Sequence, residues 1–204
     1  MSSVSLDLDG YTDLPDGKVA FVVTFLEMTA PPAGPLAEER SDVSLERWGS
    51  PDLADYKRLF REIGEDWLWF GRLLLDDDDL QARLTAPGHE VFTPVMDGRV
   101  MGLLEIDYQD AENPELAYFG LIPSAVGTGL GRWLMQQAAA MVWARAQTKR
   151  FWVHTCTGDS PQALGFYRSC GFKPYKRAIE VADDPRATGL LGKDKGPHVP
   201  FLAR

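Results

Sequence analysis

The chain has 204 residues, of which 45% are hydrophobic and 25% charged, and its formal net charge is −9. A chain of this length and composition can bury one substantial core, so we expect one globular domain and not a disordered polypeptide. The net negative charge argues against nucleic acid or an anionic membrane surface as the main partner, because both bind clusters of Lys and Arg. The negative charge favours a cationic partner instead.

Nothing in the sequence indicates export or a membrane span. Met1-Ser2-Ser3-Val4 has neither a basic nor an apolar signal region, and no apolar run approaches the roughly 20 residues of a membrane helix. We therefore expect a cytoplasmic protein. Cys156 and Cys170 are too few for a disulfide framework and lack metal-type spacing, so both are interpreted as reduced packing residues.

The first part of the chain predicts an extension, a strand, a loop and helices. Residues 1–17 are polar and turn-rich, and the β-branched and aromatic run at 19–26 predicts a strand. Prolines and a glycine predict a loop over 29–41. Helical periodicity then extends over 51–75 with an interruption at Gly64, which predicts two helices.

Two clusters in this region have more than one interpretation. The run Trp67-Leu68-Trp69-Phe70 is interpreted either as core or as part of a substrate pocket. The four aspartates Asp76–Asp79 resemble a metal site, but adjacent side chains on a regular backbone point in different directions. We expect them instead to cap the following helix and to face solvent.

The middle of the chain predicts a hairpin, a third strand and a long helix. Asp97-Gly98 stands between apolar runs at 90–96 and 99–108, which is typical of a hairpin with a two-residue turn. A strand at 115–122 precedes a segment of helical periodicity from Gly129 to about Gln147.

The last part predicts two strands around a short helix. Phe151–Cys156 has the composition of a buried strand, and Asp159 or Ser160, followed by Pro161, would cap the helix after it. A last strand is predicted at 175–181. The tail that follows is rich in proline and glycine, and it is expected to wrap the surface or to remain mobile.

The most informative segment is Gly127-Thr128-Gly129-Leu130-Gly131, which directly precedes the long helix. A helix start carries unpaired N–H groups and the positive end of the helix dipole, so it attracts an anion, and glycines leave room for a phosphate. A dinucleotide fingerprint needs glycine where Arg132 stands, and a P-loop needs a Gly-Lys-Ser/Thr ending, so both motifs are missing. The segment predicts a site for a di- or triphosphate group, with glycines that serve only a tight turn as the alternative.

This segment resembles the pyrophosphate loop of the GNAT acetyltransferase family, Arg/Gln-x-x-Gly-x-Gly/Ala before a long helix. Val126 stands where the family usually has Arg or Gln. A second segment, Asp159–Phe172, is similar to the family's D-N-P-x-A-x-x-x-Y-x-x-x-G-F, with Ser160 in place of Asn. The two motifs occur in the family's order, about 30 residues apart with a strand between them, and the resemblance covers about Val43 to Val181.

The resemblance implies a fold and a division of the chain. The fold is an α/β domain with a mixed, mostly antiparallel central sheet and helices on both faces. We expect this domain over 18–182, between an N-terminal extension at 1–17 and a C-terminal tail at 183–204.

The resemblance also implies transfer of an acetyl group from acetyl-CoA to an amine, directly and in a ternary complex. Glu115 occupies the position of a general base that takes the proton of the amine, and Tyr167 that of a tyrosine which protonates the departing thiolate. Tyr118 and Trp69 are expected to line the acceptor site. The residues expected to bind acetyl-CoA are Phe119, Gly120, Leu121, Ile122, Val126, Gly127, Thr128, Gly129, Leu130, Gly131, Arg132, Ser160, Ala163 and Tyr167.

Each of these roles has a structural alternative. Glu115 can be an ordinary solvated strand-end residue, and Tyr118 and Tyr167 can serve packing alone. His89 and His154 have no ligand spacing and are interpreted as structural, and no metal is expected. At the level of the protein, the alternatives are a non-catalytic acyl-CoA-binding or sensor module and an ordinary nucleotide-binding protein. The acceptor is expected to be a small-molecule or protein amine, and the chain a monomer or a homodimer.

Overall fold

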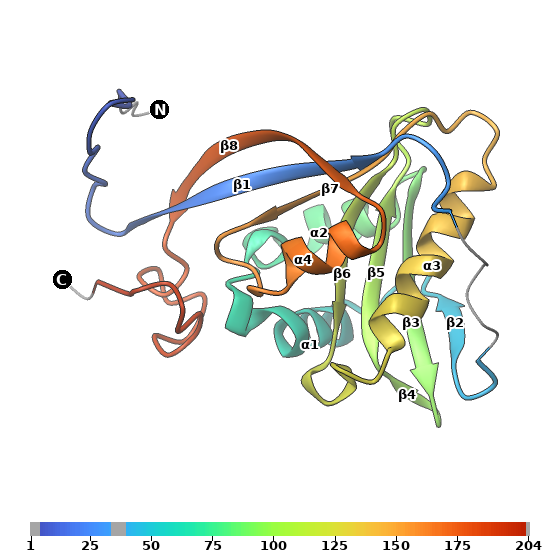
Figure 1. Ribbon diagram of the computed structural model, residues 1–204. Helices are drawn as coiled ribbons and strands as arrows, with labels where there is room; N and C mark the ends of the chain where they lie inside the picture. The colour runs from blue at the N-terminus through green and yellow to red at the C-terminus, as the bar shows by residue number, and fades with distance from the viewer. Residues whose placement is uncertain (1–4, 34–39, 203–204) are drawn as a thin grey trace.

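A computed structural model describes residues 5–33 and 40–202 (Figure 1). The expectation for Met1–Val4 and part of the loop expected over 29–41 lie outside these residues. Eight strands form one sheet in the order β2-β3-β5-β6-β7-β1-β8, with β4 paired to β3. The strands are β1 (Lys18–Met28), β2 (Ser44–Arg47), β3 (His89–Met96), β4 (Arg99–Val100), β5 (Gly102–Asp107), β6 (Glu115–Leu121), β7 (Phe151–Cys156) and β8 (Lys173–Asp183).

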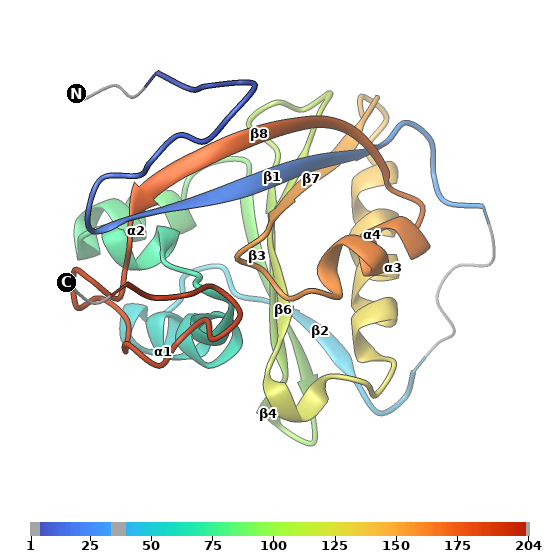
Figure 2. The same cartoon turned by 60° about the vertical axis from the view of Figure 1, so that its left-hand side comes forward.

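Every neighbouring pair of strands is antiparallel except β6 and β7. The helices are α1 (Leu53–Gly64), α2 (Asp77–Leu84), α3 (Leu130–Trp143) and α4 (Ala163–Ser169). Figure 2 shows the sheet edge-on, with α1 and α2 on one side and α3 and α4 on the other. We call these sides the α1–α2 face and the α3–α4 face. The mixed sheet with helices on both faces is therefore confirmed.

Helix α1 follows directly from the periodicity of its sequence. Its buried side chains Tyr56, Leu59, Phe60 and Ile63 recur at helical spacing, and the Asp52 carboxylate caps its first turn by accepting from two backbone N–H groups. The capping role of the aspartate run is also confirmed, because Asp76 Oδ1 accepts from Asp79 N at 2.8 Å at the start of α2.

The prediction of a second helix between Gly64 and Leu75 was wrong. This segment consists of two 3₁₀ turns, Glu65–Trp67 and Gly71–Leu74, separated by Leu68 in the left-handed conformation with φ 52°. Trp69 N donates to Gly64 O at 2.9 Å, and the Trp69 ring fills the space where Gly64 would carry a Cβ. Packing of one tryptophan against the end of α1 thus outweighs the helical pattern.

Two helix boundaries also differ from the predictions. Helix α3 ends at Trp143, four residues before Gln147, and α4 begins at Ala163 without a side-chain cap. Asp159 does not cap α4, because its Oδ2 accepts from Thr155 Oγ1 at 2.7 Å and from Cys156 N at 3.0 Å on β7. In the described part of the chain, no helix is both long enough and apolar enough to span a membrane.

The tail after β8 wraps the surface beside α1, which is one of the two expected alternatives (Figure 2). Arg186 organises it, with an exposed fraction of only 2%. Its Nε and Nη2 donate to the two carboxylate oxygens of Asp184 at 2.9 and 2.8 Å, and its Nη1 donates to the carbonyl oxygens of Lys195 and Val199. The tail is fastened to the body by His198, whose Nε2 bonds to Gly158 O at 2.8 Å.

Replacing Arg186 with Met is expected to lower the free energy of unfolding by about 3 kcal/mol, because the Asp184 carboxylate and several carbonyl oxygens then lose their donor. Urea denaturation measures the change. The control is Arg58→Met, which removes an exposed pair with Asp55 at 2.9 Å and should cost less than about 1 kcal/mol. Equal losses in the two variants would contradict the organising role of Arg186.

Candidate functional site

The parallel neighbours β6 and β7 are joined at one end and then diverge (Figure 1). Glu115 pairs with Trp152, and Trp152 N donates to Pro114 O at 3.1 Å. No further residue pair joins the two strands within the part of the chain that the structure describes. Since hydrogen bonds recur evenly along a regular parallel pair, β6 and β7 are not paired with each other beyond this point, and the N–H and C=O of Cys156 on β7 bond to Asp159 instead. We call this unpaired stretch between the two strands the gap.

A β-bulge in β6 decides which side chains lie beside this gap. Glu115 pairs with Asp107 and Tyr118 pairs with Glu105, so Ala117 is an extra residue without a partner on β5. Residues directly opposite each other in an antiparallel pair share a face of the sheet. Glu115 and Tyr118 therefore point to the same face, although simple alternation would place them on opposite faces.

That shared face is the α1–α2 face. The Tyr118 ring lies edge-on to Phe60 of α1, with ring centroids 4.9 Å apart, and to Trp69 at 5.2 Å. Trp69 Nε1 donates to Asp159 Oδ1 at 3.1 Å, which fixes the indole beside the end of β7. The structure thus brings together Tyr118 and Trp69, the two residues expected to line the acceptor site.

The candidate base Glu115 is bonded to a histidine that was interpreted as structural. Its Oε1 lies 3.1 Å from His154 Nδ1 on β7, and the Glu115 side chain is 24% exposed. This hydrogen bond is the main reason that the pKa of His154 is raised above its usual value. Sequence spacing gave no signal for the pair, because only the register of β6 against β7 places the two side chains together.

Tyr167 lies across the sheet from Glu115, on the α3–α4 face. Its ring is edge-on to Phe119 of β6 at 6.4 Å, and only 7% of the residue is exposed. Its hydroxyl has no hydrogen bond to any of the described residues. Burial raises the pKa of Tyr167 well above its usual value, so the hydroxyl keeps its proton at neutral pH. The gap between β6 and β7 separates the two predicted catalytic side chains.

The glycine turn forms a cradle of free donors before α3. The N–H groups of Gly127, Thr128, Gly129, Gly131 and Arg132 have no acceptor among the described residues. Gly127 and Gly129 are left-handed, with φ 83° and 82°, and a Cβ at either position would meet nothing within 4 Å. Free donors, open space and the start of a helix together fit a pyrophosphate group.

The other predicted cofactor residues have different environments. Ile122 is buried in the core, whereas Val126 is 67% exposed. A side chain at Gly120 would overlap Ile63 and Trp69, so this glycine allows α1 to pack closely against β6. Ser160 and Ala163 form the turn into α4, in which Ala163 N donates to Ser160 O at 2.9 Å.

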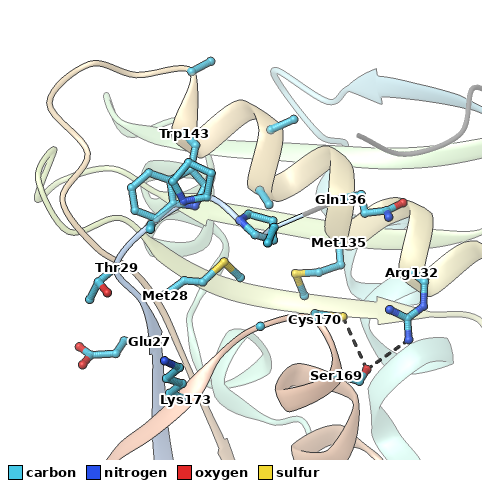
Figure 3. Close-up of a pocket in the computed structure, with 18 residues that line it drawn as sticks. Glu27, Met28, Thr29, Arg132, Met135, Gln136, Trp143, Ser169, Cys170 and Lys173 are labelled. Atoms are coloured by element: carbon cyan, nitrogen blue, oxygen red, sulfur yellow. Dashed lines mark hydrogen bonds between the residues drawn. The ribbon is translucent and has the colours of Figure 1, made fainter. Parts of the chain in front are cut away.

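A groove of about 840 Å³ lies along the outer side of α3, facing the end of β1 and the turn from α4 to β8 (Figure 3). Met135 and Trp143 of α3 line it on one side, and Met28 and Cys170 on the other. Arg132 is the predicted cofactor residue that borders this groove, and its Nη2 donates to Ser169 Oγ at 3.3 Å. The glycines of the cradle and the residues beside the gap lie outside this groove.

A second cavity, of about 440 Å³, opens on the α1–α2 face beside Tyr118 and Arg72. Below it lies Glu105, which is fully buried and accepts hydrogen bonds from Tyr56, from Arg72 at 2.7 Å and from His89 at 2.9 Å. Burial alone would raise the pKa of Glu105, but these partners outweigh it and lower the pKa. This cluster around Glu105 was not predicted from the sequence. The one signal that could have indicated it is a glutamate inside the otherwise apolar strand β5.

Comparisons with known proteins agree on one family. The model of the acetyltransferase (GNAT) family matches residues 55–172. An uncharacterised N-acetyltransferase from the pepI 3' region of Lactobacillus delbrueckii subsp. lactis is 27% identical over 139 residues, which are 63% of this chain and 78% of the relative.

Solved structures show the same fold. A GCN5-related N-acetyltransferase from Kribbella flavida has a TM-score of 0.53 at 17% identity, over 83% of this chain and 60% of that one. A conserved protein of unknown function from Staphylococcus epidermidis has a TM-score of 0.58 at 15% identity, over 82% of this chain and 64% of that one. This chain thus spans less than two thirds of either structure.

Proposed function

Since this chain belongs to the GNAT acetyltransferase family, we propose that it transfers an acetyl group from acetyl-CoA to an amine, directly and in a ternary complex. The observation that carries the proposal is the gap between β6 and β7. Tyr167 lies on the α3–α4 side of this gap and Glu115 on the α1–α2 side. We propose that two substrates approach from opposite faces and meet where the strands are unpaired.

The cradle and the β6 edge are the groups that would hold acetyl-CoA. The five free N–H groups from Gly127 to Arg132 would bind the pyrophosphate, and the free backbone edge of Phe119–Leu121 would pair with the pantetheine amides as an added strand does. When bound, acetyl-CoA supplies a thioester carbonyl that an amine can attack. The missing side chain of Arg or Gln at Val126 leaves the backbone donors to bind the phosphates.

Glu115 and Tyr167 would move the two protons of the reaction. An amine with a pKa near 10.4 is free base in only about one molecule in two thousand at pH 7, so Glu115 accepts its proton, with His154 as hydrogen-bond partner. The new C–N bond forms as the C–S bond breaks. Tyr167, whose hydroxyl is protonated at neutral pH, then gives its proton to the thiolate, and the second proton that the nitrogen loses as the amide forms returns to the tyrosine oxygen.

The direct test is amine-dependent release of CoA from acetyl-CoA across a panel of polyamines, amino acids and aminoglycosides. We expect release with at least one class, and we expect Gly129→Ala to weaken acetyl-CoA binding about tenfold or more, because its Cβ enters the open space of the cradle. Calorimetry measures the affinity.

The matched control is Gly17→Ala. Gly17 is also left-handed, with φ 75° and open space around it, but it precedes β1, so the variant adds the same backbone strain outside the cradle. Equal loss of affinity in both variants would assign the effect to strain. Tight acetyl-CoA binding without CoA release from any amine would leave a binding module and refute the proposed enzyme.

A further inference from the structure

The cavity of about 440 Å³ beside Tyr118 contains polar groups that acetyl transfer does not use. Arg72, Tyr118 and Gln109 line it, together with Arg83 and Asp79. A cavity with a few convergent polar groups is the usual form of a small-molecule site. This cavity opens on the α1–α2 face, the face to which Glu115 points.

Arg72 is held rigidly with one edge free. Its Nε and Nη2 donate to Glu105 Oε2 at 3.2 and 2.7 Å, its guanidinium lies 4.8 Å from the centre of the Tyr118 ring, and its side chain is 13% exposed. Nη1 has no hydrogen-bond partner within 5–33 or 40–202. A guanidinium can bind two carboxylates in forked geometry, one on each edge, so the Nη1–Nη2 edge remains available for a second.

Glu105 anchors the arginine and is not itself a ligand site. It is completely buried, and its two oxygens already accept from Tyr56, Arg72 and His89. Its negative charge explains how a largely buried guanidinium is tolerated in the fold. The second polar group beside the cavity is the Tyr118 hydroxyl, which lies against Gly71 and has no partner among the described residues.

The other charges around the cavity favour a singly charged ligand. Arg83 Nη1 lies 3.7 Å from Asp107 Oδ2, so its positive charge is partly balanced, and Asp79 lies exposed at the rim of the cavity. A dianionic phosphate would be repelled by Asp79, and the arginines around the cavity have too little unbalanced positive charge to compensate. A carboxylate needs only the free edge of Arg72 and the Tyr118 hydroxyl.

We propose that the acceptor is an amine that also carries a carboxylate, as an amino acid does, and that Arg72 binds this carboxylate in the cavity. The proposal rests on the proposed acetyltransferase activity. Tyr118 directly follows the bulge at Ala117 and shares its face with Glu115, so a carboxylate bound beside Tyr118 holds the molecule on the face of the proposed base. The acceptor's other end can then direct its amine to the gap.

The test compares matched acceptors on the wild-type protein. Amino acids and the corresponding amino-acid amides differ in the charge of one group and in the pKa of the α-amine, so kcat/KM is compared per free-base amine, and we expect it to favour the acids by about 10- to 100-fold. In Arg72→Lys, which keeps a cation for Glu105 but loses the fork, we expect this ratio to fall at least several-fold. Arg58→Lys, at an exposed arginine paired with Asp55, is the control that should keep the ratio.

The outcomes separate this inference from the proposed activity. Equal kcat/KM for acids and amides would overturn the carboxylate site and leave the acetyltransferase intact. If no amine of either kind releases CoA, the proposed activity fails, and thermal shift then decides the site: amino acids, but not their amides, should stabilise the wild-type protein. Absence of that stabilisation would overturn the site as well.

Discussion

Replacing Tyr167 with Phe is expected to lower kcat by about 10²- to 10⁴-fold with an accepted amine, while acetyl-CoA affinity changes much less. The change removes one hydroxyl and keeps the ring that packs on Phe119 and Phe172. Because that hydroxyl has no hydrogen bond to the described residues, its loss breaks no internal contact. Only the proton donor for the thiolate is lost.

The measurement is steady-state CoA release at saturating acetyl-CoA, with a melting curve for each variant. Tyr108→Phe is the matched control, because Tyr108 is also buried and its hydroxyl also has no hydrogen-bond partner in the described structure. This control should keep kcat within about twofold. A folded Tyr167→Phe variant within about threefold of wild type would remove Tyr167 from the chemistry.

Glu115→Gln should have an effect of similar size and should also change the pH profile. We expect kcat/KM to fall by about 10²- to 10⁴-fold, because the glutamine keeps the shape but cannot accept the proton of the amine. The pKa of His154 is raised above 6.5 mainly by its hydrogen bond to Glu115. Loss of the carboxylate should therefore lower the pKa of His154 toward 6.5.

The sign of the pH effect follows from that hydrogen bond. At low pH the protonated His154 holds the Glu115 carboxylate, and as the pH rises through the raised pKa of His154 the imidazole loses its proton and the carboxylate becomes the stronger acceptor. Wild-type kcat/KM should thus rise with increasing pH, with a midpoint above pH 6.5. Any residual activity of the Glu115→Gln variant should rise with a midpoint at lower pH. Glu112→Gln, an exposed pair with Lys149, should change neither value. Identical midpoints in wild type and Glu115→Gln would contradict the coupling.

Local pattern was enough to predict the local structure of those parts of the candidate site that depend on consecutive residues. The cradle at Gly127–Gly131 and the position of Tyr167 on α4 follow from a motif and from helical periodicity. The family and the fold were predicted for the same reason, because both motifs lie in uninterrupted segments. Asp159, in contrast, was one of two residues predicted to cap α4, with Ser160 as the alternative, although its carboxylate binds β7 and Trp69.

The parts that depend on strand register or on burial could not be read from the sequence. A single unpaired residue, Ala117, brings Glu115 onto the same face of the sheet as Tyr118. No residue type at this position predicts the bulge. His154 meets Glu115 through pairing between strands that are distant in the chain. Arginine is usually exposed in proteins, and Arg186 becomes buried only because the tail folds around it.

The position of β1 between β7 and β8 has a consequence for how the protein forms during synthesis. Val22 N donates to Thr157 Oγ1, 135 positions later, and the described strand pairs with β7 and β8, which come much later in the sequence. Contacts so distant in sequence slow folding, because the long intervening loop must close first. During synthesis β1 therefore has no strand partner until β7 and β8 have been made, and both of its edges stay open to other strands for that time.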